Sequence, residues 1–379
     1  MNNKLNIRII AIASLLALPA AALAQFPATT YGWNLGNTLE PSCGEGCWAP
    51  PATQQLINAV AAQGFNCMRI PVAWDSHANS RTHQIDSAWL ARVAQVVTWS
   101  RTAGMTVVID NHWDTGWFDG CGFRRFDSRL NSKFQSYWTQ IANYFKNYDS
   151  GLLFCAANEP DVGSAANMAV LLQYYQTFVN AVRGTGGNNT TRWLVLPGPS
   201  TDIDKTDSWF NTLPTDPTPG RLVIDVHYYA PWQYCGLTSD ASWGKMFYFW
   251  GQAYHTSVPS LLIRNPDWGE EAYMLAELQK MQAKFISKGI PVIVGEFGAI
   301  KRTGNPELTG VELNRHLASR TYFDKTVLAY CGQTGLKPFY WDEGFNGDNG
   351  FAVFDRVTAT VTDPDSVRAL TGGAALPPP

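Results

Sequence analysis

The stretch GLLFCAANEP, residues 151–160, places a short apolar run directly before an amide, a carboxylate and a proline. The run Leu152–Ala157 is typical of a strand buried on both faces, although its pattern does not by itself exclude a buried helix segment. In a parallel barrel, polar groups at the carboxyl ends of strands carry the chemistry, so Asn158 and Glu159 are candidate catalytic residues. Taken alone, Glu159 is equally well explained as a cap of the next helix.

Runs of this kind recur along the chain and alternate with helical patterns. The eight strand candidates are Tyr31–Leu35, Phe65–Ile70, Met105–Asp110, Leu152–Ala157, Trp193–Pro197, Leu222–His227, Pro291–Glu296 and Lys337–Trp341. The helical patterns are Thr53–Ala62, Ser87–Ala103, Asn131–Tyr148, Ala165–Arg183, Glu271–Lys288 and Val311–Cys331, with a weaker one at Thr201–Thr212. Glycines follow several helical patterns as stop signals, at Gly64, Gly104, Gly184 and Gly289.

The alternation predicts an α/β fold, a (β/α)8 TIM barrel that forms a single domain over residues 25–371. A doubly wound sheet is the alternative, and it would need a glycine-rich phosphate loop after an early strand. The segment Gly32–Gly36 is too short for such a loop and lacks its third glycine. Residues 372–379 form a Gly/Pro-rich tail.

The N-terminus has the pattern of an export signal. Lys4 and Arg8 precede the apolar stretch Ile9–Leu18, and Ala22-Leu23-Ala24 offers a small-residue cleavage site. The apolar stretch is too short to span a membrane comfortably. We therefore expect residues 1–24 to be a signal peptide and the mature protein to be secreted, extracellular or periplasmic, with no membrane anchor.

Composition narrows the possible partners. The net charge is −3 and basic residues do not cluster, which argues against nucleic-acid binding. The chain has 15 Trp, more than a core requires, so we expect some of them to line a surface cleft. The long connection from Pro231 to Glu270 is rich in aromatic residues. It is either a wall of that cleft or a small satellite hydrophobic cluster.

The seven cysteines all follow the export signal. Cys43 and Cys47 flank a Gly-Glu-Gly loop, and a local disulfide between them is plausible in an exported protein. A zinc site there is less plausible, since a second Cys/His pair is missing at ligand spacing. Cys67 and Cys155 lie in strand-like runs and are expected to be buried. The odd number leaves at least one thiol unpaired unless chains cross-link.

A partner for Glu159 ends the seventh strand candidate, in Pro291-Val-Ile-Val-Gly-Glu296. A barrel places the ends of its fourth and seventh strands across one mouth, so Glu159 and Glu296 are expected to face each other there. Two facing carboxylates are what glycosidic cleavage requires. One is protonated and gives its proton to the departing oxygen, and the other is ionised and attacks the anomeric carbon or activates water.

Other polar or aromatic residues end neighbouring strands. Arg69 closes the second strand, where its charge would hold a glutamate ionised. His112 follows the third strand, His227 closes the sixth, and Trp341 ends the eighth. Each alone has an ordinary structural explanation, as an ion pair, a hydrogen-bonded core histidine or core packing. Their common position at one end of successive strands favours a functional site.

With these motifs the chain resembles glycoside hydrolase family 5, in the barrel clan with catalytic glutamates on strands four and seven, and it is most similar to cellulase-type bacterial endo-β-glucanases. The matching stretches span nearly the whole mature chain in the family's order. They are Gly32–Thr38, Met68–Val72, Ile109–His112, Asn158–Pro160, Val226–Tyr229, Gly295–Gly298 and Tyr340–Trp341.

The resemblance implies roles for individual residues. Glu159 is expected to be the acid/base and Glu296 the nucleophile, with Arg69 and Tyr229 in contact with the nucleophile. Asn158 is expected to bind the sugar 2-hydroxyl, and Trp341 to form the platform under the sugar at the cleavage point. The remaining candidate substrate-binding residues are His112, His227, Trp33 and Asn37.

Retaining chemistry follows from the resemblance, with carboxyl groups about 5–5.5 Å apart. The negative charge of Glu296 is expected to raise the pKa of Glu159 in the free enzyme. A monomer acting on β-glucan is expected, without a metal or organic cofactor. The alternatives are an endo-hydrolase of mixed-linkage glucan, xyloglucan or mannan on the same scaffold, and an inactive carbohydrate-binding barrel.

Overall fold

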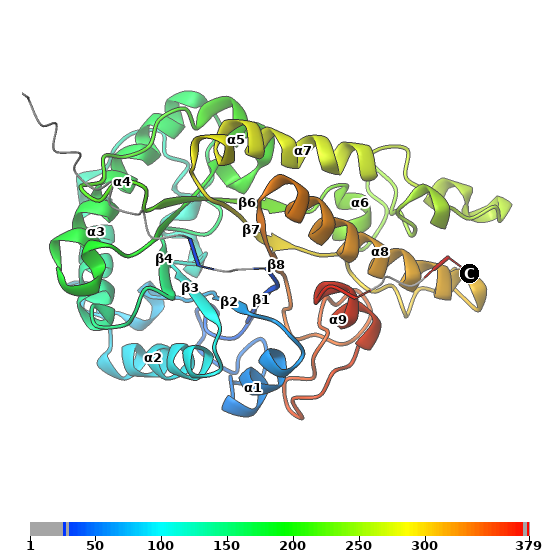
Figure 1. Cartoon of the computed structure of the whole chain (residues 1–379), viewed down its shortest axis with the longest axis horizontal. Coiled ribbons are helices and arrows are strands. Elements are labelled where there is room, and N and C mark those ends of the chain that lie inside the picture. The colour runs from blue at the N-terminus through cyan, green and yellow to red at the C-terminus, as the bar shows by residue number, and fades with distance from the viewer. Residues whose placement is uncertain (1–25, 28–29, 374–376, 379) are drawn as a thin grey trace, which may run out of the picture.

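Eight parallel strands close into a barrel at the centre of the molecule (Figure 1). The computed structural model describes residues 26–27, 30–373 and 377–378. Each strand pairs with the next, and β1 pairs with β8 to close the ring. The strands are β1 Gly32–Asn34, β2 Cys67–Ile70, β3 Thr106–Asp110, β4 Leu152–Cys155, β5 Leu194–Pro197, β6 Leu222–Tyr228, β7 Val292–Phe297 and β8 Lys337–Tyr340. All eight predicted strands and the predicted barrel are confirmed.

Helices surround the barrel and cover its outer face (Figure 1). They are α1 Gln54–Ala62, α2 Ser87–Thr102, α3 Ser128–Phe145, α4 Ala165–Gly184, α5 Ile203–Trp209, α6 Trp232–Cys235, α7 Glu271–Lys284, α8 Val311–Thr334 and α9 Pro364–Leu370. Short 3-10 helices are η1 Asp75–His77, η2 Asp114–Gly116, η3 Asp119–Cys121, η4 Gly187–Thr190, η5 Pro199–Thr201, η6 Gln252–Tyr254, η7 Pro259–Arg264 and η8 Ile286–Lys288. The weakest predicted helix therefore exists, as α5.

Capping side chains explain where two helices begin. Asp127 accepts hydrogen bonds from the backbone N–H groups of Arg129 and Leu130, so α3 starts three residues before the predicted Asn131. Asp202 caps α5 in the same way by accepting from the N–H of Lys205. A carboxylate at this position also suits the positive end of the helix dipole.

Three of the predicted glycine stops have left-handed backbone. Gly64, Gly104 and Gly289 have φ values of 100°, 85° and 77°, which side chains with a Cβ rarely adopt. Gly184 is instead the last residue of α4, and the chain turns at Gly186, where φ is 70°. The helix therefore ends one residue later than predicted, at Gly184 itself.

The barrel interior is apolar at one level and charged at the next. An apolar cluster inside the barrel includes Cys67, Val108 and Val223. Two residues further along the same strands come Arg69, Asp110 and Asp225, which are fully buried. Because side chains alternate between the two faces of a strand, these charged residues point inward above the apolar layer. The carboxyl end of the barrel thus carries a buried charged floor.

A β-bulge in β7 sets the direction of Glu296. Val226 of β6 pairs with Val294, but His227 pairs with Glu296, so Gly295 is an extra residue. Such a bulge re-aims the following side chain. A Cβ at Gly295 would lie 2.3 Å from Oδ1 of Asp225. The backbone N–H of Gly295 donates to the same oxygen at 2.9 Å. Only glycine fits between Asp225 and the glutamate that follows.

The connection between β6 and α7 projects from the barrel beyond α6 (Figure 1). Tyr248, Phe249 and Leu261 pack with Leu308 as a small separate cluster, so the predicted satellite cluster is present. Other aromatic side chains of the connection join the main core, among them Tyr234, Phe247 and Trp250. The segment is therefore an ordered part of the fold.

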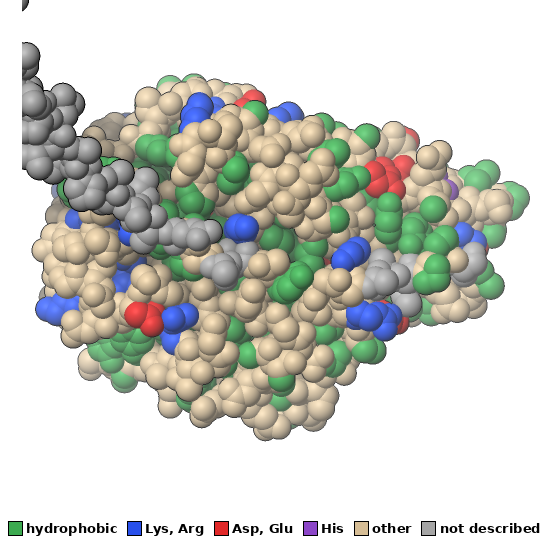
Figure 2. Space-filling view, in the orientation of Figure 1, with side chains coloured by type: hydrophobic (Ala, Val, Ile, Leu, Met, Phe, Trp, Pro, Cys, Tyr) green, Lys and Arg blue, Asp and Glu red, His purple; other side chains and the backbone are tan. Residues whose placement is uncertain are grey.

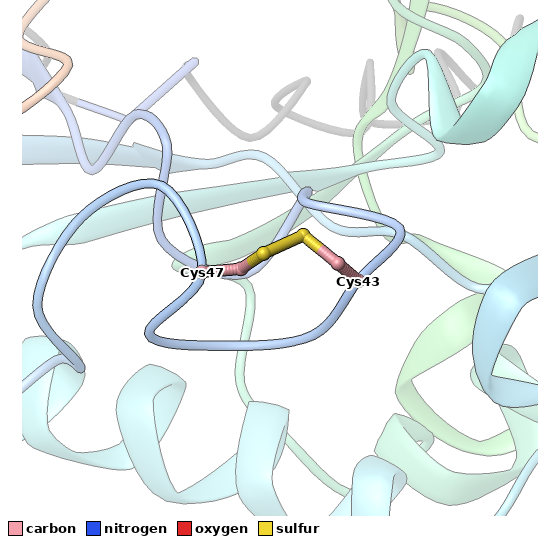
Figure 3. Close-up of a disulfide and its surroundings, with 2 residues drawn as sticks. All are labelled: Cys43 and Cys47. Atoms are coloured by element: carbon pink, nitrogen blue, oxygen red, sulfur yellow. A yellow bond between two sulfur atoms is a disulfide. The ribbon is translucent and has the colours of Figure 1, made fainter.

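Cys43 and Cys47 form a disulfide across their loop, as the sequence predicted (Figure 3). The other five cysteines are free thiols. Cys67 and Cys155 are buried, which confirms their assignment to strand interiors. The disulfide closes the loop that follows β1 at the carboxyl end of the barrel.

The predicted signal peptide, residues 1–24, lies outside the described residues, and so does part of the tail at 372–379. Within the described part of the chain, none of the helices combines the length and the apolar character that crossing a membrane requires.

Candidate active site

Arg69 is the centre of a buried hydrogen-bonded network at the carboxyl end of the barrel. Its guanidinium contacts Oδ2 of Asp110 and Oε1 of Glu296, both at 2.8 Å. It also donates to the side-chain oxygens of Asn34 at 3.0 Å and Asn158 at 2.6 Å. Burial by itself lowers the pKa of Arg69, but the charges of Asp110 and Glu296 outweigh it and raise the pKa. The guanidinium therefore remains a permanent cation beside Glu296.

Glu296 is held by two donors, one on β2 and one directly after β6. Its Oε1 accepts from Arg69, and its Oε2 accepts from the hydroxyl of Tyr229 at 3.0 Å. The side chain is only 8% exposed, so these donors take the place of water. Both oxygens of Glu296 are therefore fixed in position by hydrogen bonds.

Glu159 follows β4 and extends into the open cleft, where 44% of its side chain is exposed. Nδ1 of His227 lies 2.6 Å from its Oε1 and 3.6 Å from Oε2 of Glu296. Nε2 of His227 lies 3.8 Å from Asp225 behind it. His227 therefore sits between three carboxylates and bridges the two facing glutamates.

This arrangement gives Glu159 a pKa shift in the direction opposite to the one expected. Burial raises the pKa of Glu159, but the hydrogen bond and positive charge of His227 outweigh it and leave the pKa below its usual value. Burial lowers the pKa of His227, yet Glu296, Asp225 and Glu159 together raise it to about 10. The prediction of a raised pKa for Glu159 is wrong because it omitted His227. In the free protein the proton of this pair lies on the imidazole.

His112 and Trp341 form a second part of the cleft. Their rings are stacked, with centroids 6.1 Å apart and planes inclined by 5°. Nδ1 of His112 lies 3.0 Å from Asp110, and this carboxylate raises the pKa of His112 against the opposing effect of burial. Asp110 contacts both His112 and Arg69 and therefore has a positioning role in the site.

Sequence reasoning missed Asp119, in η3 after β3. Its buried Oδ2 accepts the backbone N–H groups of Asn158 at 3.2 Å and Glu159 at 3.0 Å. Its own carbonyl oxygen accepts from the N–H of Asp161 at 2.7 Å. Asp119 therefore fixes the segment that carries Glu159. Asp119 lies 40 positions before Glu159 in a short 3-10 helix, and the sequence has no spacing or hydrophobic pattern that connects the two residues.

Two predicted substrate-binding residues occupy other positions. Trp33 is fully buried, and its indole N–H donates to Asp342 at 3.1 Å, so it cannot contact a sugar. This prediction is corrected: Trp33 points away from the barrel axis into the layer between strands and helices. Asn37 is half-buried in a turn with φ of 56°, and its backbone N–H donates to the carboxylate of Glu40. Its contact with substrate stays a prediction.

Among the described residues, one group of three could geometrically hold a metal ion. It comprises Glu159, His227 and Glu296, whose ligand atoms lie within 4.8 Å of one another. Their mutual hydrogen bond and the neighbouring Arg69 already account for this proximity. An oxygen of Glu159 and an oxygen of Glu296 therefore lie within 4.8 Å of each other at the carboxyl end of the barrel.

Fold and site together define a (β/α)8 barrel with the paired carboxylates of a glycoside hydrolase. The model of the cellulase family, glycosyl hydrolase family 5, matches residues 29–347. The chain belongs to this family, and it is an enzyme of the endo-β-glucanase type.

Relatives agree with this assignment. Endoglucanase A of Paenibacillus barcinonensis is 34% identical over 90% of this chain and 87% of its own length. A xyloglucan-specific β-1,4-glucanase from a ruminal metagenomic library has a similar structure, with a TM-score of 0.83, 38% identity and coverage of 91% of this chain and 94% of its own. A family 5 xyloglucanase from Paenibacillus pabuli has a TM-score of 0.81, 34% identity and coverage of 90% and 97%.

Proposed function

We propose that this endo-β-glucanase cleaves internal β-1,4 bonds of a glucan with retention of anomeric configuration. The observation that carries the proposal is the facing pair of Glu159 and Glu296, which have oxygens within 4.8 Å of one another. Retaining enzymes hold their carboxyl groups about 5–5.5 Å apart, whereas inverting enzymes leave about 6.5–9.5 Å for a water molecule. The separation supports a nucleophile and an acid/base.

In the first step, Glu296 attacks the anomeric carbon. Arg69 and Tyr229 hold its carboxylate in position, and one oxygen forms a bond to that carbon as the bond to the leaving oxygen breaks. Glu159 supplies the proton for the leaving oxygen. That proton reaches Glu159 from His227 across their 2.6 Å contact, since a sugar that fills the cleft excludes water and favours the neutral carboxyl.

In the second step, Glu159 acts as a base. It takes a proton from water as the water oxygen attacks the anomeric carbon and the bond to Glu296 breaks, and this proton then returns to His227 across the same contact. Glu296 returns to its ionised form beside Arg69. The reaction consumes one water molecule, and the two displacements leave the product in the β configuration.

The sugar at the cleavage point is proposed to bind between Trp341 and Asn158. Arg69 donates a hydrogen bond to the side-chain oxygen of Asn158. The side-chain NH2 of Asn158 therefore remains as a donor for the 2-hydroxyl. Trp341, stacked with His112, supplies an aromatic face for the apolar face of the sugar ring. Hydrogen bonds to the 2-hydroxyl strengthen in the transition state of this reaction.

Xyloglucan is the second candidate substrate. Two solved structures with 38% and 34% identity to this chain are described as xyloglucanases. Xyloglucan has the same β-1,4-glucan main chain as cellulose and adds side sugars. Both substrates therefore present the same bond to Glu159 and Glu296, and the loops around the cleft decide between them.

A panel of polymers tests the proposed substrate. We expect reducing ends to appear from carboxymethylcellulose or xyloglucan, and solution viscosity to fall early, as internal cleavage requires. Turnover of β-mannan should be at least about tenfold slower, since mannose differs at C2, where Asn158 binds. The Glu296→Gln variant, purified identically, is the control for contaminating activity. Fastest turnover of mannan would contradict the proposal.

The protein is proposed to act outside the cytoplasm as a monomer, on dissolved or exposed β-glucan. The N-terminal pattern of a signal peptide supports export. Export also suits a substrate that is a polymer too large to enter a cell, and an oxidising compartment suits the Cys43–Cys47 disulfide.

A further inference from the structure

A second pocket lies on the projecting segment between β6 and α7. It encloses about 480 Å³, and its wall includes Gln233, Trp243, Phe247, Leu262, Ile263 and Trp268. Trp243 is 63% exposed and Trp268 is 41% exposed. Hydrophobic side chains gather on the surface at this end of the molecule (Figure 2). An apolar surface that stays exposed around a pocket indicates a binding site.

The backbone that carries the two indoles is ordered by hydrogen bonds. Trp243 stands at a tight turn in which the backbone groups of Ala241 and Gly244 exchange hydrogen bonds of 2.9 and 3.2 Å. The backbone beside Trp268 is anchored by the buried Trp250, whose indole N–H donates to the carbonyl oxygen of Gly269 at 2.9 Å. A binding surface with an ordered backbone loses less entropy when it binds a ligand than a flexible loop does.

Two chains of contacts connect this pocket with the catalytic cleft. Trp268 packs edge-on against Tyr273, with ring centroids 5.4 Å apart, and Tyr273 lines a cavity of about 250 Å³ that also contains Glu159. Trp232, next to Gln233, packs edge-on against Tyr229 with centroids 6.1 Å apart. Through Tyr273 and Tyr229, the pocket is therefore in contact with the wall of the cavity that contains Glu159.

The cavity that contains Glu159 and Tyr273 is the leaving-group side of the cleft. An acid that protonates the departing oxygen must lie beside the departing sugar. The stacked pair of His112 and Trp341 does not line this cavity and belongs to the other side of the cleavage point. A glucan that leaves the catalytic pair on the Tyr273 side therefore runs toward Trp268.

We propose that the pocket between Trp243 and Trp268 is a distal subsite that binds the β-glucan main chain beyond the leaving-group side. Indole faces suit the apolar faces of glucose rings, and Gln233, Asn265 and Asp267 in the same wall suit their hydroxyl groups. The wall contains one Lys and one Asp, so it favours a neutral ligand over a charged one. This proposal rests on the proposed function.

Kinetics on a long and a short substrate distinguish a distal subsite from a purely structural role of Trp243 and Trp268. The variants are Trp243→Ala, Trp268→Ala and the double variant, and the control is Tyr144→Ala on α3, an aromatic residue 43% exposed outside the pocket. On the best polymer of the panel we expect KM to rise about tenfold for the double variant, with kcat retained, as the loss of uniform binding requires. On an aryl β-cellobioside, too short to reach the pocket, the kinetics should not change.

Three results would overturn the distal subsite. One is an unchanged KM on the polymer for the double variant. The second is an equal loss of kcat/KM on the polymer and on the aryl β-cellobioside, which would mean that the two indoles stabilise the fold and do not bind substrate. Size-exclusion chromatography adds a third, because a dimer that the double variant disrupts would make the pocket a contact between copies. If the unmodified enzyme hydrolyses neither substrate, the proposed function itself fails.

Discussion

The Glu296→Gln variant is expected to lose turnover of β-glucan by a factor on the order of 10⁴ or more, the size of loss that removal of a nucleophile causes in other hydrolases. An amide cannot form the covalent bond to the anomeric carbon. The fold should survive, because Arg69 keeps Asp110, Asn34 and Asn158 as partners and the amide oxygen still accepts its hydrogen bond. The measurements are kcat on the polymer and the thermal unfolding midpoint.

The control for this variant is Glu307→Gln, which replaces a glutamate with 44% side-chain exposure that pairs with Arg264 instead of Arg69. It should keep normal kcat. Near-normal hydrolysis by the Glu296→Gln variant would remove Glu296 from the role of nucleophile. A large fall in the unfolding midpoint, in contrast, would mean that its loss of activity reports unfolding.

The Glu159→Gln variant is expected to behave differently with different leaving groups. On the polymer, whose leaving alcohol needs a proton, kcat should fall by about 10²–10⁴-fold. On dinitrophenyl β-cellobioside, whose leaving group departs without a proton, formation of the glycosyl-enzyme should continue at a near-normal rate. Its breakdown should be slow, since water then lacks a base, and added azide should restore turnover and yield a β-glycosyl azide.

The side-chain exposure of Glu307 equals that of Glu159, so Glu307→Gln is again the matched control. Relative to the unmodified enzyme, the kcat of this control should change neither with the leaving group nor with added azide. Equal losses of the Glu159→Gln variant on both substrates, without rescue by azide, would assign Glu159 a structural role. The burst of dinitrophenolate measured by stopped flow separates formation of the intermediate from its breakdown.

The strand pattern predicted the barrel because parallel strands that are buried on both faces have continuous apolar sequences. Each apolar run of this chain also ends near a turn or a polar residue. Glu159 and Glu296 were predictable for the same reason: each directly follows or ends such a run. Arg69, His112 and His227 followed from their positions at strand ends. The family resemblance added the role of each residue, which residue type and spacing do not determine.

What could not be predicted depends on contacts between distant loops and on the direction of side chains. Trp33 lies in a motif beside the site, but the alternation along β1 turns its ring toward the helices. Asp119 is in a short 3-10 helix and acts through backbone groups of Asn158 and Glu159. The pKa of Glu159 depends on a 2.6 Å contact with His227, and the sequence shows only that both residues end strands.

The central claim, a double displacement by Glu296 and Glu159, is tested most directly by the configuration of the first product. Proton NMR of a cello-oligosaccharide or xyloglucan digest, recorded within the first minutes, follows the anomeric signals before mutarotation mixes them. The account predicts that the β-anomer appears first and the α-anomer grows later. Initial formation of the α-anomer would show inversion and contradict it.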